Sequence, residues 1–301
     1  MPFGLKNAGA TYQRLIEKVF THLLGKCVEI YVDDMVVKSP SHLQHSKDLP
    51  KVFTTLRKYN LRLNPNKCVF DIDSRKFLGF MLTQHGIEAN PEKCKAIIEM
   101  PSPVNIKEVQ RLVGCLTAIS RFLPKLADKT KPIIHLLKKS AKFAWNDECN
   151  HIFQKLKATL ASPPILQKPD TNLPLIVYIT ATEGTVSAAI TQEYASTQYL
   201  VYFVSQSLQD PETKYQIVEK LDLSLVNVAR WLRPYFHNHQ VIVRTDYPIQ
   251  KILQKPDLAG QMSSWVVELS EFNIRYELHG PVKAQCLLDF VNDLQHAPQE
   301  E

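Results

Sequence analysis

The chain has 301 residues, of which 45% are apolar and 22% are charged, so it has the composition of a soluble globular protein with enough residues for two cores. No apolar run approaches membrane-spanning length and the start carries no signal-peptide pattern, so we expect no membrane partner. The net charge of +6 and the pI near 8.9 favour an anionic partner without naming one. The six cysteines are scattered, with no CxxC pair and no histidine spacing suited to zinc. We therefore expect reduced thiols in an intracellular compartment, cytoplasmic or nuclear.

The first predicted element is a helix over residues 8–24. It follows a short loop, and its apolar residues recur at helical spacing. The residues that define this spacing are Leu15, Val19, Phe20 and Leu23.

Residues 30–37 predict a β-hairpin with an acidic turn. Apolar residues lead up to and away from Asp33 and Asp34. Two adjacent carboxylates repel each other, and Mg²⁺ would relieve that repulsion by taking their oxygens as ligands. The same pair is also common in an ordinary solvated turn, so the pattern alone leaves both readings open.

The next segments read as a helix and a strand-turn pattern. The helix is predicted from His42 to Tyr59, interrupted near Pro50, with Val52, Phe53 and Leu56 facing inward. The run from Phe77 to Phe80 is a strand-turn pattern with Gly79 in the turn.

Two prolines, Pro101 and Pro103, mark a boundary, because neither fits inside a helix. Helical periodicity then runs over residues 105–126, 132–139 and 147–160. A charged helix face is usually only solvated, but a basic face can also follow a phosphate backbone. The basic residues in question are Arg111, Arg121, Lys125, Lys129 and Lys131.

The last part of the chain predicts a mixed α/β sheet with flanking helices. Three strands come first, and helices and strands then alternate, with the longest helix over residues 211–235. The predicted strands are 175–180, 186–192, 199–205, 240–245 and 274–278.

An ordered series of motifs carries a family resemblance over nearly the whole chain. Tyr31-Val-Asp-Asp34 lies between Pro2-Phe-Gly-Leu-Lys-Asn upstream and Leu63-Asn-Pro-Asn-Lys67 downstream. The series resembles the reverse transcriptase palm of gypsy-type LTR retrotransposons, plant-type elements above all, with Tyr31–Asp34 as the YxDD box. Tyr215-Gln-Ile-Val-Glu219-Lys-Leu and Leu232-Arg-Pro-Tyr-Phe resemble the RNase H domain of the same Pol polyproteins.

The resemblance implies an α+β and α/β chain in three parts. Residues 1–100 would be a partial palm that lacks its upstream Pol segments. Residues 101–170 would form the helical thumb or connection, and residues 171–295 would form an RNase H-like domain with a mixed sheet.

The resemblance also implies two sites, each with two Mg²⁺ ions. Asp33 and Asp34 would be the catalytic metal ligands of the polymerase, whose third aspartate belongs to a strand upstream of this chain. The RNase H ligands map onto Glu219, Asp246 and Asp289, whereas the first ligand maps onto Thr180, whose neutral hydroxyl cannot replace a bridging carboxylate. Glu183 is a weak substitute for that first ligand. The residues implied for nucleotide or template binding are Phe3, Gly4, Lys6, Gln13, Tyr31 and Lys67.

The expected function is that of a reverse transcriptase/RNase H segment with incomplete carboxylate sets. In the family the activity is RNA-directed DNA polymerisation with cleavage of the RNA–DNA hybrid, and the partners are primer-template, hybrid and dNTP. Two alternatives remain from the sequence. The chain could be a non-catalytic nucleic-acid-binding remnant, or a decayed reading frame whose exposed apolar faces prevent a stable product.

Overall fold

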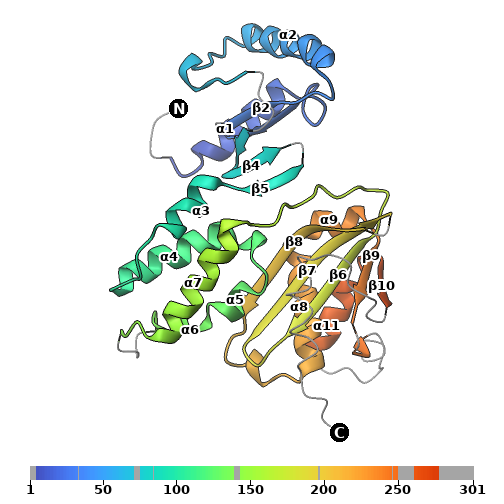
Figure 1. Cartoon of the computed structure of the whole chain (residues 1–301). Helices are drawn as coiled ribbons and strands as arrows, with labels where there is room; N and C mark the ends of the chain where they lie inside the picture. Colours follow the sequence, from blue (N-terminus) through green and yellow to red (C-terminus); the bar gives the residue numbers. More distant parts are fainter. Residues whose placement is uncertain are drawn as a thin grey trace. The chain divides into compact units, whose positions relative to one another are not determined.

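A computed structural model describes residues 5–32, 34–70, 75–83, 85–138, 143–195, 197–245, 247–249 and 261–277 (Figure 1). The chain divides into two compact units, residues 1–84 and 85–301, and each is described by itself. Within the described ranges, no helix is both long and apolar enough to cross a membrane.

The first unit packs helices against a small hairpin. Its core joins Phe20 and Leu23, which follow the first helix, to Val52 and Leu56 of the second. The predicted helix over 8–24 is wrong at its end, because α1 stops at Val19 and a run of turns carries Phe20 and Leu23 into the core. The elements are α1 (Ala8–Val19), β1 (Val28–Tyr31), β2 (Asp34–Val37), α2 (His42–Lys58), η1 (Pro65–Lys67), β3 (Arg75–Phe77) and β4 (Phe80–Thr83).

Helix α2 is continuous, so the interruption predicted at Pro50 is wrong. Pro50 is exposed, and the missing N–H removes one hydrogen bond while Val52 and Leu56 still bury the inner face of the helix. The helix ends in a Schellman motif, in which Leu61 N–H donates to Leu56 C=O at 2.9 Å. Asn60 takes the left-handed position of that motif, with φ +53°.

The hairpin predicted at residues 77–80 is confirmed. Strands β3 and β4 pair antiparallel with Phe77 opposite Phe80. Leu78 and Gly79 both have positive φ, at +51° and +80°, which is the pattern of a type I′ turn.

The second unit begins with a strand and a group of short helices. The predicted helix over 105–126 is wrong in length, because α4 ends at Ala118 and only a 3₁₀ turn follows. Leu123 precedes Pro124, which disfavours the helical conformation, and Leu123 is extended. Asparagine side chains cap the longer helices at residues 90, 105 and 146. The elements are β5 (Gly86–Ala89), α3 (Pro91–Ile98), α4 (Ile106–Ala118), η2 (Ser120–Phe122), α5 (Leu126–Lys129), α6 (Lys131–His135) and α7 (Asp147–Ala161).

A five-stranded mixed sheet forms the centre of the second unit, and the predicted strands are confirmed to within two residues at each end. The strand order is β10-β9-β6-β7-β8. Strands β6, β7 and β8 form an antiparallel meander, whereas β9 runs parallel to both β6 and β10. The strands are β6 (Leu175–Ala181), β7 (Thr185–Tyr194), β8 (Thr197–Ser207), β9 (Val241–Arg244) and β10 (Ile274–Glu277).

The single long helix predicted over 211–235 is three helical pieces. Gln216 is extended and forms a capping box with Glu219, which starts a new helix. Pro234 lies in the first turn of the last piece, and it cannot continue a preceding helix. The pieces are η3 (Glu212–Lys214), α8 (Ile217–Trp231) and α9 (Arg233–Asn238).

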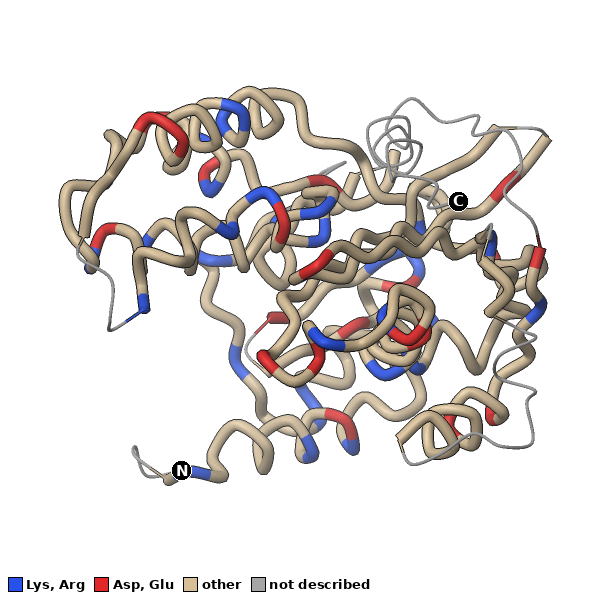
Figure 2. The backbone as a smooth tube through the Cα atoms, turned by 90° about the horizontal axis from the view of Figure 1, so that it is seen from below, with Lys and Arg blue, Asp and Glu red and all other residues tan. Residues whose placement is uncertain are grey.

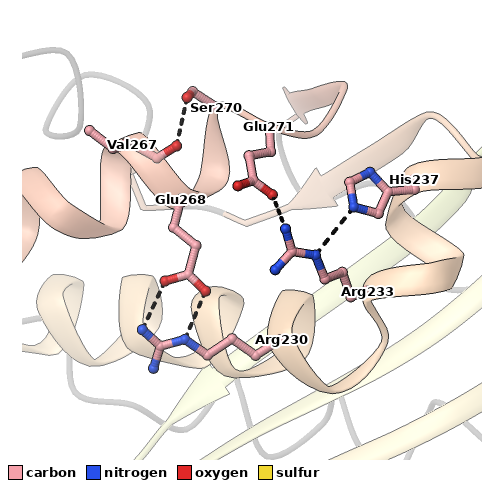
Figure 3. Close-up of polar contacts among 7 residues, drawn as sticks. All are labelled: Arg230, Arg233, His237, Val267, Glu268, Ser270 and Glu271. Carbon is pink, nitrogen blue, oxygen red and sulfur yellow. Dashed lines mark hydrogen bonds and ion pairs between the residues drawn. The ribbon is translucent and has the colours of Figure 1, made fainter.

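Helices α8 and α11 (Gln261–Leu269) cover one face of the sheet, where Leu175, Val177 and Ile179 of β6 enter the core (Figure 1). One ion pair joins these two helices at the surface, and a second joins α9 to the residues that follow α11, as Figure 3 shows. Arg230 contacts Glu268 through two hydrogen bonds of 2.8 Å, which lowers the pKa of that carboxyl. Arg233 of α9 donates to Glu271 at 2.6 Å.

Candidate functional site

The acidic hairpin of the first unit is formed as predicted. Tyr31 and Asp34 face each other at the ends of β1 and β2, and both side chains are exposed. Val32, between them, has φ +48°, a conformation that costs a β-branched residue energy. Asp33 lies outside the described residues, as do Phe3 and Gly4.

Gln13 holds this turn against α1. Its side-chain oxygen accepts a hydrogen bond from the Val32 backbone N–H at 2.6 Å, and its amide nitrogen donates to the Ile30 carbonyl at 3.2 Å. The same nitrogen donates to Glu17 at 2.9 Å. The Gln13 amide, which was predicted to contact template or nucleotide, therefore bonds to the backbone of the hairpin. We call this pair of bonds the clamp, because it holds the strained turn against α1.

Replacing Gln13 by Ala should loosen the turn, because the Val32 N–H would lose its acceptor. A lost hydrogen bond of this kind costs about 1–2 kcal/mol, which corresponds to roughly 5- to 30-fold faster exchange of the Val32 amide. Hydrogen exchange read by mass spectrometry measures this change, and the exposed neighbour substitution Arg14→Ala is the control. Equal exchange in the two variants would contradict the clamp.

The two predicted lysines of this unit are exposed. Lys6 lies in the turn before α1, and Lys67 ends the 3₁₀ helix η1. Their ammonium groups are open to an anion, and their role in nucleotide binding stays a prediction.

In the second unit, Thr180 lies near the end of β6 opposite Ser187 of β7. It is 6% exposed. Because side chains alternate along a strand, Thr180 faces away from the core formed by Val177 and Ile179. The Ser187 hydroxyl is 2.8 Å from the hydroxyl of Ser205 on β8, so this face of the sheet carries a row of hydroxyl groups at that level.

Two ammonium groups lie on the turn that follows β6. Lys220 of α8, which is buried, donates from Nζ to the Glu183 carbonyl oxygen at 3.1 Å. Lys131 of α6 reaches the same turn, since its Nζ lies 3.2 Å from where a Cβ on Gly184 would be. Glu183 itself is exposed at the turn, and its backbone oxygen, not its carboxylate, makes the contact with Lys220.

A carboxylate of α5 also contacts this turn. Asp128 of α5 accepts hydrogen bonds from the hydroxyls of Thr182 and Thr185, at 3.3 and 3.1 Å. These bonds fix the turn against α5. Of the two ammonium-bearing side chains at the turn, Lys131 is exposed and Lys220 is buried.

Glu219 is the RNase H ligand that lies within the described residues. Its carboxylate accepts from the Gln216 backbone N–H at 2.9 Å, so it caps the start of α8. Asp246 and Asp289 lie outside the described residues.

Sequence reasoning missed Asp222, one turn further along α8. It is fully buried, and among the described residues neither of its carboxylate oxygens has a hydrogen-bond partner. Desolvation, with a smaller contribution from the nearby charge of Glu219, raises its pKa to about 7. The sequence offered a weak signal, because Asp222 lies between Leu221 and Leu223 in a helix that is mostly apolar up to Ala229.

The described residues do not by themselves make a magnesium site. Mg²⁺ takes several oxygen ligands in near-octahedral geometry, and no three of the described Asp, Glu, His or Cys side chains gather in this way. Each predicted site contributes one described carboxylate, Asp34 in the first unit and Glu219 in the second. At the second site the first ligand position holds a threonine with lysines nearby.

Two families match the chain, one in each unit. Residues 1–82 match the reverse transcriptase (RNA-dependent DNA polymerase) family, and residues 145–243 match the RNase H-like domain found in reverse transcriptase. The gap between the two matches falls on the helices α3 to α6.

Pol polyproteins of retrotransposons are similar to nearly the whole chain. The Retrovirus-related Pol polyprotein from transposon 297 of Drosophila melanogaster is 33% identical over 92% of the chain, and that of transposon opus is 30% identical over 96%. The transposon Tf2-3 polyprotein of Schizosaccharomyces pombe is 25% identical over 91%. The chain spans 26%, 30% and 21% of the lengths of these three relatives.

Solved structures share the fold. The foamy viral protease-reverse transcriptase in complex with RNA/DNA hybrid has a TM-score of 0.82 and 22% identity, covering 100% of this chain and 40% of that one. The same protein in complex with dsDNA has a TM-score of 0.77 and 22% identity, covering 94% and 60%. The predicted combination of a palm and a mixed-sheet RNase H-like domain is thereby confirmed. The chain therefore contains one segment that matches the reverse transcriptase family and one that matches the RNase H-like domain found in reverse transcriptase, and it is similar to part of retrotransposon Pol polyproteins.

Proposed function

We propose that this chain binds RNA–DNA hybrid and primer-template duplex through its second unit and that its RNase H-like domain binds the hybrid without cleaving it efficiently. In the intact Pol polyprotein, the first unit would contribute Asp33 and Asp34 to a polymerase site that takes dNTP and Mg²⁺. The plant-type origin and an intracellular location, cytoplasmic or nuclear, belong to the same proposal.

The observation that carries this proposal is the charge at the turn after β6. A divalent metal needs a carboxylate at position 180, and the chain has a neutral threonine there with Lys220 and Lys131 at the following turn. Ammonium groups repel a divalent cation and attract a phosphate. The end of the sheet therefore favours a nucleic-acid backbone over a metal pair.

The distribution of charge is compatible with such a local site. Figure 2 shows Lys and Arg interspersed with Asp and Glu along the backbone. The formal charge of +6 is thus not collected in one stretch of the chain, and specific small groups of cations must supply any phosphate contacts.

Hybrid binding should depend on Lys131. We expect the full chain to bind a 16-base-pair RNA–DNA hybrid with an affinity that falls steeply with salt, and Lys131→Ala to reduce the slope of log affinity against log salt by about 1. Fluorescence anisotropy measures both quantities. Lys155→Ala, an exposed lysine of α7, is the matched control and should leave the slope unchanged. A hybrid that does not bind, or a slope that is equal in both variants, would contradict this assignment.

The wild-type chain should cleave the hybrid slowly or not at all, and Thr180→Asp should increase the rate of cleavage. This variant restores the missing carboxylate type at the position that the family resemblance assigns to the first ligand. Hybrid cleavage assayed in Mg²⁺ distinguishes an active RNase H-like domain from one that only binds the hybrid. Efficient, Mg²⁺-dependent cleavage by the wild-type chain would refute the proposed loss of activity. If Glu219→Gln cleaved equally well, the role assigned to Glu219 would be refuted too.

A further inference from the structure

An exposed tryptophan stands at the end of α8. The indole of Trp231 is 69% exposed, whereas that of Trp265 is 2% exposed in the core. A large aromatic side chain left in water forgoes the burial that usually stabilises it, so its exposure calls for an explanation outside the fold.

Two other elements of the second unit hold this indole in place. Its Nε1–H donates to the hydroxyl of Tyr202 on β8 at 3.2 Å. The guanidinium carbon of Arg121, from η2, lies 4.9 Å from the centroid of the Tyr202 ring. We call Trp231, Tyr202 and Arg121 the aromatic platform. It lies at β8, the edge strand of the sheet, against which η2 packs.

We propose that the aromatic platform stacks one unpaired base of a nucleic-acid strand, with Arg121 attracting the adjoining phosphate. A base stacked on an indole contributes affinity without regard to sequence, because every base has a flat π face. An indole whose N–H is already bonded has fewer orientations to lose on stacking, which favours binding. This inference rests on the proposed nucleic-acid function and adds a site to it.

The surroundings favour a nucleic acid over a protein partner. A protein interface needs a continuous apolar centre with a polar rim, and the described chain neighbours of Trp231 do not supply one. Its neighbour Leu232 is buried, and Arg230 and Arg233 on either side are engaged with Glu268 and Glu271 (Figure 3). The exposed surface at this point is one ring beside a cation, which is complementary to a base and its phosphate.

Tryptophan fluorescence gives a direct test, because the chain has three tryptophans and they differ in exposure. Trp265 is buried and Trp145 is half-buried, so an added strand can reach Trp231 most readily. The full chain is titrated with a twelve-nucleotide oligo(dT) and with an abasic strand of equal length that has the phosphates but not the bases. We expect oligo(dT), and not the abasic strand, to quench the fluorescence.

The variants separate this inference from the proposed function. Trp231→Ala should abolish the quenching and weaken oligo(dT) binding about tenfold or more, while leaving binding of the fully paired hybrid unchanged. Tyr194→Ala, an exposed aromatic at the β7–β8 turn, is the matched control and should bind like the wild type. If the chain binds the hybrid but the wild type and Trp231→Ala bind oligo(dT) with equal affinity, the aromatic platform is refuted and the proposed function is not. Absence of binding to any strand would overturn the proposed function as well, and a change of oligomeric state in Trp231→Ala would instead assign the surface to a second copy of the chain.

Discussion

Replacing Asp222 by Asn should raise the free energy of unfolding of the second unit by roughly 4 kcal/mol at pH 8. The carboxylate is fully buried and has no hydrogen-bond partner in the part of the chain that the structure describes, so its charged form is unfavourable, and its pKa is raised to about 7. The unfolded side chain has a pKa near 3.8. A difference of about three pKa units corresponds to roughly 4 kcal/mol.

The pH dependence follows from the sign of this shift. Near pH 3 the carboxyl is protonated in both states, and ionisation imposes no penalty. As the pH rises from about 4 to about 7, the unfolded state gives up the proton and the folded state keeps it, so the stability of the unit falls. Above the folded pKa the penalty is complete and constant. The Asp222→Asn variant should lack this decline.

Urea unfolding followed by tryptophan fluorescence measures the effect in the right unit, since all three tryptophans lie within residues 85–301. The matched control is Asp210→Asn, an exposed aspartate, which should change the stability by less than about 0.5 kcal/mol. Identical pH profiles for the wild type and Asp222→Asn would show that Asp222 does not carry the penalty. A large stabilisation by Asp222→Asn would also favour the hypothesis of a decayed reading frame, because a buried carboxylate without a partner lowers the stability of the folded chain.

Replacing Gly86 by Ala should destabilise the second unit by roughly 3 kcal/mol or more. Gly86 has φ +138°, a conformation that favours glycine, and an added Cβ would collide with the backbone oxygen of Leu166. That oxygen accepts from the Ile87 N–H at 2.7 Å, and the Leu166 N–H donates back at 2.9 Å. The collision must move one chain and break this reciprocal pair.

A second glycine provides the opposite control. Gly114 lies inside α4, and a Cβ there would meet nothing within 4 Å. Gly114→Ala should therefore stabilise the same unit by about 1 kcal/mol through helix propensity. Thermal unfolding of both variants, read by the same fluorescence, should move the Tm in opposite directions. A loss at Gly114 equal to that at Gly86 would show that the close approach at Leu166 is not responsible.

The sequence alone predicted the elements that depend on local patterns. The acidic hairpin at Tyr31–Asp34 and the five strands of the sheet follow from alternating apolar residues and turn residues, and the family motifs place them in order. Helix ends were less predictable. The break at Gln216 is marked by a capping box of two residues only three positions apart, a local signal that the periodicity did not register. Pro50 was tolerated because its side of α2 is exposed.

Only the tertiary structure decided what the site residues contact. Gln13 and Val32 are 19 positions apart, and Lys220 and Glu183 are 37 apart, so no local pattern could report either hydrogen bond. The burial of Asp222 likewise depends on packing between distant elements. Residue type alone established that position 180 holds no carboxylate. The cations beside it, the aromatic platform and the unpartnered carboxylate became visible only when the sheet brought distant segments together, because contact between such segments is set by packing and not by sequence spacing.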